Sequence, residues 1–264
     1  MERRGLRLMV AAVLTMGLSA VFVAPAGAGA EGNLQVATSL PAPGFWGDSL
    51  DAKPADIDSG FEYDLAVAIA EKLGYTGIKL KNTSFDALVA GKAKGFDIAL
   101  TQASITPERK KVVTFSKPYF RSNQGILVQT GTTVDASNAK SIRWGVQTGT
   151  TAQTFLEEEL KPDTDPRSYQ ETTQAFAALQ AGQVDAVMLD TAIVLPQAKL
   201  SDGELEVVGQ YENPDNYGII MSKGSKLKKQ VNTALAELEA DGTLAQLSRD
   251  NLGKAPEDVP FLEI

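Results

Sequence analysis

The sequence predicts an α/β protein made of two similar lobes with a ligand cleft between them. Short apolar segments typical of strands alternate with helical segments, which favours parallel strand pairing. A unit of helix, glycine, turn, aspartate and apolar strand occurs twice, at residues 85–100 and 176–189. The chain of 264 residues is long enough for two lobes of ordinary size. In such folds a ligand binds beyond the strand ends, so we expect the site in the cleft.

Residues 1–30 have the pattern of a secretory signal peptide. Arg3 and Arg4 give a basic start, residues 8–24 form an uncharged run, and small residues follow. We expect cleavage after this segment, with a retained transmembrane anchor as the alternative and twin-arginine export as a weaker indication. The chain has no cysteine to carry a lipid, so the sequence predicts a free periplasmic or secreted protein.

The expected elements follow one another without a long linker. Strand-like runs lie at residues 34–38, 78–80, 96–100, 125–128, 142–146, 186–189, 205–208 and 217–222. The clearest helix spans residues 62–73, where Leu65 and Ile69 begin a repeat of apolar residues every four positions. A second clear helix spans residues 226–240.

The repeated unit predicts how the chain divides between the lobes. Residues 31–121 together with 215–264 are expected to form lobe 1, and residues 122–214 are expected to form lobe 2. The chain then crosses between the lobes twice, so we expect hinge crossings near residues 121–125 and 212–217.

Composition excludes several kinds of chemistry. The chain contains no cysteine and no histidine, so it has no disulfide, no Cys or His nucleophile and no zinc site built from these residues. Its net charge of −8 and the lack of a basic patch argue against a nucleic-acid partner. We predict no metal and no cofactor.

One stretch carries groups suited to binding a carboxylate. The strand-like run 96–100 ends in a hydroxylated turn that leads into a short helix, with Thr106 as N-cap and Pro107 at the first helical position. Free backbone N–H groups, hydroxyls and the Arg109 guanidinium would then converge just beyond a strand. A capped surface helix with a solvated arginine would give the same pattern. Other segments of the chain are therefore needed to tell a carboxylate site from a surface helix.

Five segments of the chain together carry a family resemblance. They are residues 60–70, 104–109 with 114–119, 145–151, 185–190 and 217–221. In this order they resemble the family 3 extracellular solute-binding proteins of ABC importers, which mostly capture amino acids. The resemblance implies the two-lobed periplasmic-binding-protein fold, in which each lobe is a mixed sheet flanked by helices. It also implies a monomeric, non-enzymatic receptor that closes on a free amino acid and delivers it to a membrane permease.

The resemblance gives roles to the residues that would bind the ligand's main chain. Arg109 is expected to hold the α-carboxylate, helped by Ser104 and by Thr151 of lobe 2. Asp190 is expected to pair with the α-ammonium group, and the Gln102 carbonyl to share that role.

Five further residues concern the ligand's side chain. Phe85 is expected to lie flat against it, although a place in the core would explain this residue as well. Gln147 is expected to contact it from lobe 2. Ser39 stands where relatives that bind basic amino acids carry an acid, and Ala42 stands where they often carry an aromatic residue, which Trp46 is expected to replace. These departures predict a neutral polar amino acid, with glutamine favoured.

Simpler roles remain open for several residues. Asp190 could cap the helix that begins after it, and Thr150 or Thr151 could be only a helix cap. Asp97 and Asp185, which precede apolar strands in the two copies of the repeat, are expected to be structural.

Two other functions remain alternatives to transport. Enzymes resembling cyclohexadienyl dehydratase share the implied fold, and Asp or Glu side chains can do acid–base work without histidine. A ligand-sensing subunit of a receptor would carry the same binding site.

Overall fold

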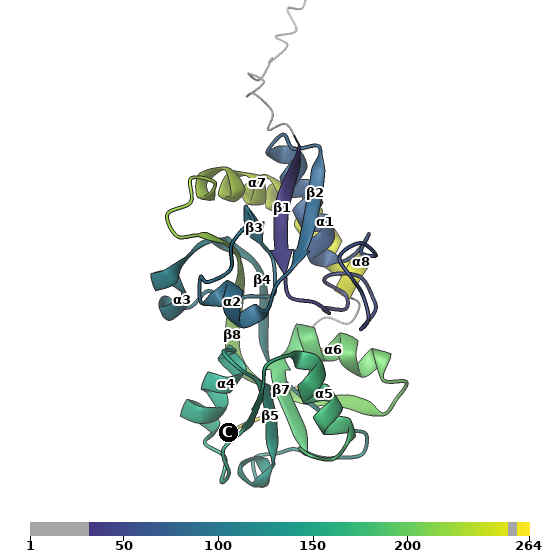
Figure 1. The fold of residues 1–264 in the computed structure, drawn as a ribbon. Helices are drawn as coiled ribbons and strands as arrows, with labels where there is room; N and C mark the ends of the chain where they lie inside the picture. The colour runs from purple at the N-terminus through teal and green to yellow at the C-terminus, as the bar shows by residue number, and fades with distance from the viewer. Residues whose placement is uncertain (1–31, 253–257) are drawn as a thin grey trace, which may run out of the picture.

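The chain folds into two lobes joined by two long strands (Figure 1). The structure, a computed structural model, describes residues 32–252 and 258–264. The signal peptide predicted at residues 1–30 lies outside the described residues. Among the residues that are described, no helix has the length and apolar character needed to cross a membrane.

Lobe 1 contains the N-terminal strands and the C-terminal helices, in the upper half of Figure 1. Its strands are β1 (Asn33–Thr38), β2 (Gly77–Asn82) and β3 (Ile98–Ala99). Its helices are α1 (Phe61–Lys72), α2 (Phe85–Val89), α3 (Pro107–Val112), α7 (Lys228–Ala240) and α8 (Thr243–Leu252). The apolar face of α1 packs on this lobe's core through Leu65 and Ile69, both fully buried.

Lobe 2 is built from the middle of the chain. Its strands are β5 (Trp144–Gln147), β6 (Arg167–Tyr169) and β7 (Ala186–Asp190). Its helical segments are the 3₁₀ turn η1 (Ala139–Ser141), α4 (Thr151–Phe155), the π-helical turn η2 (Leu156–Leu160), α5 (Thr172–Gln180) and α6 (Thr191–Leu200). The helical segment from residue 151 to 160 therefore changes its hydrogen-bond pattern halfway, from α-helical to π-helical.

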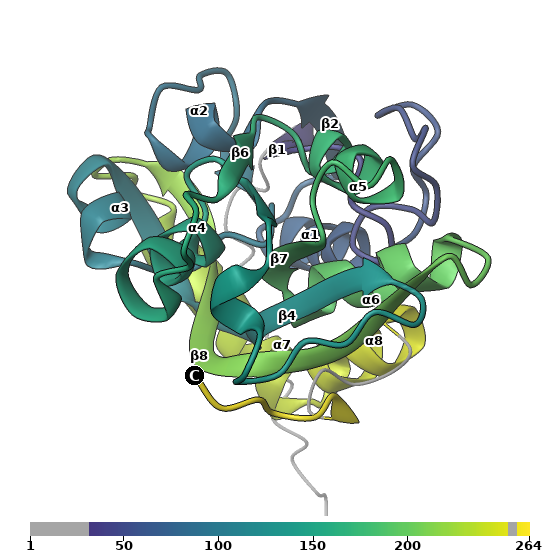
Figure 2. The ribbon, with the colours of Figure 1, turned by 90° about the horizontal axis from the view of Figure 1, so that it is seen from below.

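The two lobes share one mixed sheet because β4 (Val113–Gln129) and β8 (Leu205–Ser222) run through both. The strand order is β2-β1-β3-β8-β4-β7-β5-β6. Pairing is parallel among β1, β2 and β3 and among β5, β6 and β7, as expected. It is antiparallel wherever β4 or β8 takes part, which confirms the mixed sheet that the family resemblance implied. Figure 2 shows β4 and β8 side by side.

The two connecting strands are irregular where they pass between the lobes. Ser122 pairs with Asp215, and the register of β4 against β8 shifts between Ser122 and Gln124. The predicted crossings near residues 121–125 and 212–217 fall in this stretch, and their action as a hinge stays a prediction.

The C-terminal segment departs from the predicted division. All of residues 215–264 are expected in lobe 1, but residues 258–264 contact lobe 2. The backbone N–H of Leu262 donates to the carbonyl of Gln210 at 2.8 Å, and the Leu262 side chain packs against the lobe 2 core. Residues 258–264 therefore lie against lobe 2, where the Leu262 side chain packs on the apolar core.

The internal repeat is reproduced in three dimensions. In lobe 1, Asp97 accepts the backbone N–H of Gln35 at 2.9 Å. In lobe 2, Asp185 accepts the backbone N–H of Arg143 at 3.0 Å. Both aspartates join the start of one strand to its neighbour, which confirms their structural role.

Candidate functional site

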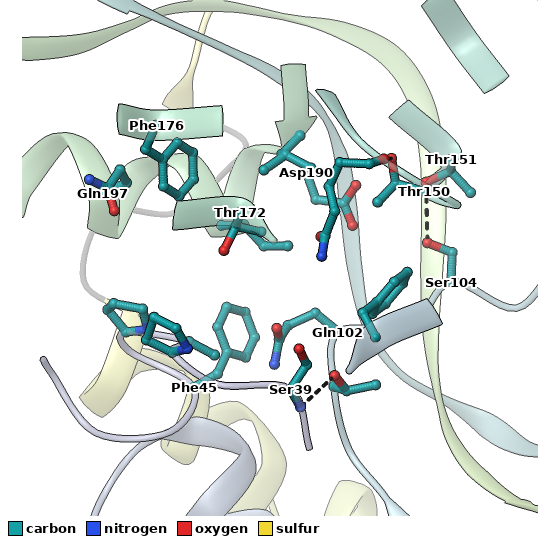
Figure 3. A pocket seen from close by; sticks show the side chains of 18 of the residues that line it. Ser39, Phe45, Gln102, Ser104, Thr150, Thr151, Thr172, Phe176, Asp190 and Gln197 are labelled. Atoms are coloured by element: carbon teal, nitrogen blue, oxygen red, sulfur yellow. Dashed lines mark hydrogen bonds between the residues drawn. The ribbon is translucent and has the colours of Figure 1, made fainter. Parts of the chain in front are cut away.

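A cavity of about 720 Å³, counted with its mouth, lies between the lobes and is lined from both (Figure 3). All but one of the predicted site residues line it, namely Ser39, Phe85, Gln102, Ser104, Arg109, Gln147, Thr151 and Asp190.

Arg109 lies on α3 and points into the cleft. Thr106 caps the helix by accepting the Arg109 backbone N–H at 3.2 Å, as predicted. The guanidinium donates to the carbonyl of Ser104 at 2.8 Å and, across the cleft, to that of Gly149 at 2.9 Å, while its carbon lies 5.3 Å from the ring centre of Phe85. The side chain is buried, so the alternative of a solvated surface arginine is wrong. Burial lowers the pKa of this group, and the nearby carboxylates oppose that effect.

Asp190 ends β7 and faces the same cavity. It stands at the N-cap position of α6 but makes no side-chain capping bond, so the simpler role as a cap is wrong. Its carboxylate instead accepts a hydrogen bond from Gln124 at 3.2 Å. Burial and then the charge of Asp215 raise the pKa of Asp190 to about 8, against the favourable contribution of Arg109.

Thr150 and Thr151 have separate roles at the start of α4. The Thr150 hydroxyl caps the helix by accepting the backbone N–H of Gln153 at 3.2 Å. The Thr151 hydroxyl therefore does not cap the helix, and it donates to the Asp215 carboxylate at 2.5 Å. It also lies 3.5 Å from the hydroxyl of Ser104, so the two lobes meet at this pair (Figure 3).

Gln102 adopts a backbone conformation that is unusual for a residue other than glycine. Its φ angle is 49°, in the left-handed region. The buried Glu62 carboxylate accepts the Gln102 backbone N–H at 2.9 Å and its side-chain amide at 2.5 Å. The same carboxylate accepts the indole N–H of Trp46 at 2.7 Å and the hydroxyl of Tyr119. Burial raises the pKa of Glu62 to about 7 although these donors favour the charged form.

Trp46 is not part of the cavity wall, and its predicted role there is wrong. It is fully buried in the core of lobe 1, where its indole N–H also contacts the carbonyl of Leu100 at 3.2 Å. A buried indole N–H needs an acceptor, and Glu62 supplies one beneath the cavity. The aromatic residue that lines the cavity from this segment is Phe45.

Several residues that line the cavity are not predicted as site residues from the sequence. They include Phe45, Thr172, Phe176, Ile193 and Gln197. A signal for Phe176 exists in the internal repeat, because Phe176 occupies the place that Phe85 has in the first copy. Phe45, Ile193 and Gln197 carry no comparable signal.

The charges of the cavity wall are few and opposite in sign. Among the described residues that line it, only Arg109 and Asp190 are ionisable. The described part of the chain contains no group of His, Cys, Asp or Glu side chains that could hold a metal ion. The wall therefore offers one fixed cation and one carboxyl group to a small ligand.

Comparison with known proteins agrees with this geometry. Residues 54–254 match the family described as bacterial extracellular solute-binding proteins, family 3. The L-cystine-binding protein TcyJ of Escherichia coli (strain K12) is 33% identical over 200 residues, which cover 74% of each chain. The structure of the arginine-, lysine-, histidine-binding protein ArtJ of Geobacillus stearothermophilus has a TM-score of 0.73 and 29% identity over 85% of this chain and 97% of its own.

A third structure bears on the enzyme alternative. It is the ancestral amino acid-binding protein AncCDT-1, described as a precursor of cyclohexadienyl dehydratase. It has a TM-score of 0.72 and 29% identity over 84% of this chain and 96% of its own.

Since the family match spans most of the chain, the protein belongs to the family 3 bacterial extracellular solute-binding proteins.

Proposed function

We propose that the cavity binds one free amino acid as a zwitterion and that the protein delivers it to an ABC permease. The observation that carries this proposal is the pair Arg109 and Asp190, the only ionisable residues among the described residues of the cavity wall. A carboxylate at Arg109 and an ammonium group at Asp190 would each gain an opposite charge away from water. Ser104 and Thr151, from the two lobes, lie beside the carboxylate position and would close over it.

The ligand's side chain is proposed to be neutral and polar, with glutamine as the first candidate. Ser39 and Gln147 line the cavity and are uncharged, and no further charged group among the described wall residues would neutralise an ionic side chain. Phe85 lies against the guanidinium of Arg109, where its ring would contact the ligand as well.

The proposal is a binding role without catalysis, in an exported protein that works as a monomer. A raised pKa at Asp190 would also suit a general acid, which is the observation in favour of the dehydratase alternative. The AncCDT-1 relative, however, is itself named as an amino acid-binding protein. Turnover of prephenate or arogenate by the purified protein would favour the enzyme instead.

Thermal unfolding in the presence of each of the twenty amino acids tests the proposal. A ligand at a hundred times its dissociation constant stabilises the folded state by about 2.7 kcal/mol, which raises the melting temperature by several degrees. The protein is first unfolded and refolded to remove any ligand carried through purification. We expect one or a few neutral polar amino acids to raise the melting temperature. If none of the twenty amino acids raises it, the proposal is contradicted.

A further inference from the structure

The end of the cavity away from Arg109 contains a polar side chain without a partner. In Figure 3, Gln197 lies at one end of the cavity, while Ser104 and Thr151 lie at the other. Gln197 comes from α6 of lobe 2 and is only 5% exposed. Its side-chain oxygen is buried and accepts no hydrogen bond from any described residue. Buried amide oxygens without a partner are rare in folded proteins, so this one needs an explanation.

The surroundings of Gln197 are otherwise apolar. Phe176 and Ile193 line the same wall from lobe 2, and Phe45 faces them from lobe 1 (Figure 3 shows Phe45 and Phe176). A ligand lying from Arg109 toward Gln197 would place an apolar stem between these side chains and its terminal group at the amide. The arrangement therefore suits a long side chain with a polar end.

We propose that Gln197 recognises the end of the ligand's side chain and selects an uncharged group that carries N–H donors, such as a carboxamide or a ureido group. This inference rests on the proposed function and names its ligand class. An amide paired with an amide gives and accepts a hydrogen bond at once, which satisfies the buried oxygen of Gln197.

Other terminal groups fit this end of the cavity less well. A carboxylate would bring acceptors against the Gln197 oxygen, and a hydrocarbon or thioether end would leave that oxygen unpaired. A guanidinium or ammonium group would be buried without a counter-ion, because the wall's acid, Asp190, is needed for the α-ammonium group. The preferred ligands are thus glutamine and citrulline over glutamate, methionine and arginine.

Calorimetric titration of the refolded protein with these five amino acids tests the proposal, using two variants. Gln197→Leu keeps the volume and removes the amide, so glutamine and citrulline should bind about tenfold more weakly or worse, while methionine is unaffected or binds more tightly. Gln197→Glu supplies a carboxylate at the same place, so arginine should gain affinity relative to citrulline. That gain is a result that a misfolded variant cannot produce. Gln183→Leu, at an exposed glutamine of the same lobe, is the matched control and should change nothing.

The outcomes separate this inference from the proposed function. If the wild type binds none of the twenty amino acids, both fail. If the wild type binds amino acids but prefers arginine or glutamate, the neutral polar side chain and the role of Gln197 are both overturned, while amino-acid binding stands. If neither Gln197 variant changes the order of preference, only the role of Gln197 is overturned.

Discussion

Glu62 holds Gln102 by two hydrogen bonds, one to its backbone N–H at 2.9 Å and one to its side-chain amide at 2.5 Å. A non-glycine residue at a φ of 49° persists only where its surroundings fix it. Glu62 provides that fixation from the first turn of α1, although it does not line the cavity itself. It thereby shapes the part of the wall where the Gln102 carbonyl is proposed to meet the ammonium group.

Replacing Glu62 by Gln is expected to weaken both the fold and ligand binding. Glu62 accepts hydrogen bonds from four donor groups. A glutamine in its place has only one acceptor oxygen, so its own NH₂ group would face some of these donors. We expect the free energy of unfolding to fall by about 1–3 kcal/mol, and affinity to fall as well, in denaturant unfolding and calorimetry. Glu71→Gln, on the exposed face of the same helix, is the control. Unchanged affinity in a folded Glu62→Gln protein would mean that the Gln102 conformation does not depend on this carboxylate.

Replacing Arg109 by Ala is expected to abolish tight binding. The variant would leave the ligand carboxylate buried without its counter-ion, at a cost of about 3–5 kcal/mol in binding free energy. Calorimetry with the amino acid found in the thermal screen measures this loss. Lys111→Ala removes an exposed cation from the same helix and should bind normally. Normal binding by Arg109→Ala would show that the carboxylate lies elsewhere.

Ligand affinity is expected to fall as the pH is lowered. Burial first, and then the charge of Asp215, raises the pKa of Asp190 to about 8. The ligand's ammonium group favours the ionised form, so binding at neutral pH should release a proton. Below that pKa, affinity should decline by as much as about tenfold per pH unit. Titrations in buffers of different ionisation enthalpy measure the proton release directly, and uptake of a proton would contradict this ionisation of Asp190.

The same ionisation has the opposite effect on the folding stability of the ligand-free protein, which should fall as the pH rises. A carboxyl group whose pKa is raised by folding stabilises the folded state only while it stays protonated. The contribution of Asp190 is therefore complete below its unfolded pKa of about 4 and is lost as the pH rises through about 8. Asp190→Asn should reduce this dependence in thermal unfolding of the ligand-free protein. An unchanged pH profile would assign the dependence to other groups.

Gly60→Ala is expected to destabilise lobe 1 strongly. A Cβ atom at this position would lie 2.5 Å from the carbonyl oxygen of Phe45, and the φ angle of 121° disfavours any side chain. We expect a loss of about 2 kcal/mol or more in denaturant unfolding. Gly182→Ala is the matched control, because its φ is 66° but no atom lies within 4 Å of the added Cβ. It should cost about 1 kcal/mol. Equal losses in the two variants would show that the contact with Phe45 is not the cause.

The candidate site could be largely predicted because most of its residues stand directly beside a strand or helix end. Asp190 ends β7, Arg109 lies in the first turn of α3, and Thr151 begins α4, so a local pattern is enough to place each one near the sheet edge. Phe45 and Trp46 show the limit of this approach. They are adjacent in an irregular segment and both are buried in the lobe 1 core, but only Phe45 also reaches the cavity, while the Trp46 indole donates to the buried Glu62.

The fold was predictable element by element but not in its long strands. The runs at 205–208 and 217–222 are two parts of β8, separated by polar residues such as Asp215 and Asn216. Polar residues usually end a strand in sequence patterns, but here they continue the backbone pairing with β4 where the lobes meet. The role of Gln197 could not be predicted from the sequence either, because the face of α6 that lines the cavity between the lobes is set by tertiary packing.

The recognition of both ends of a zwitterion is tested most directly with ligand derivatives. Calorimetry would compare the amino acid identified in the thermal screen with its Nα-acetyl derivative and its α-carboxamide. Each derivative lacks one of the charges proposed to meet Asp190 and Arg109. We predict that both bind about a hundredfold more weakly or worse than the parent amino acid. Retained affinity for either derivative would contradict the assignment of the corresponding residue.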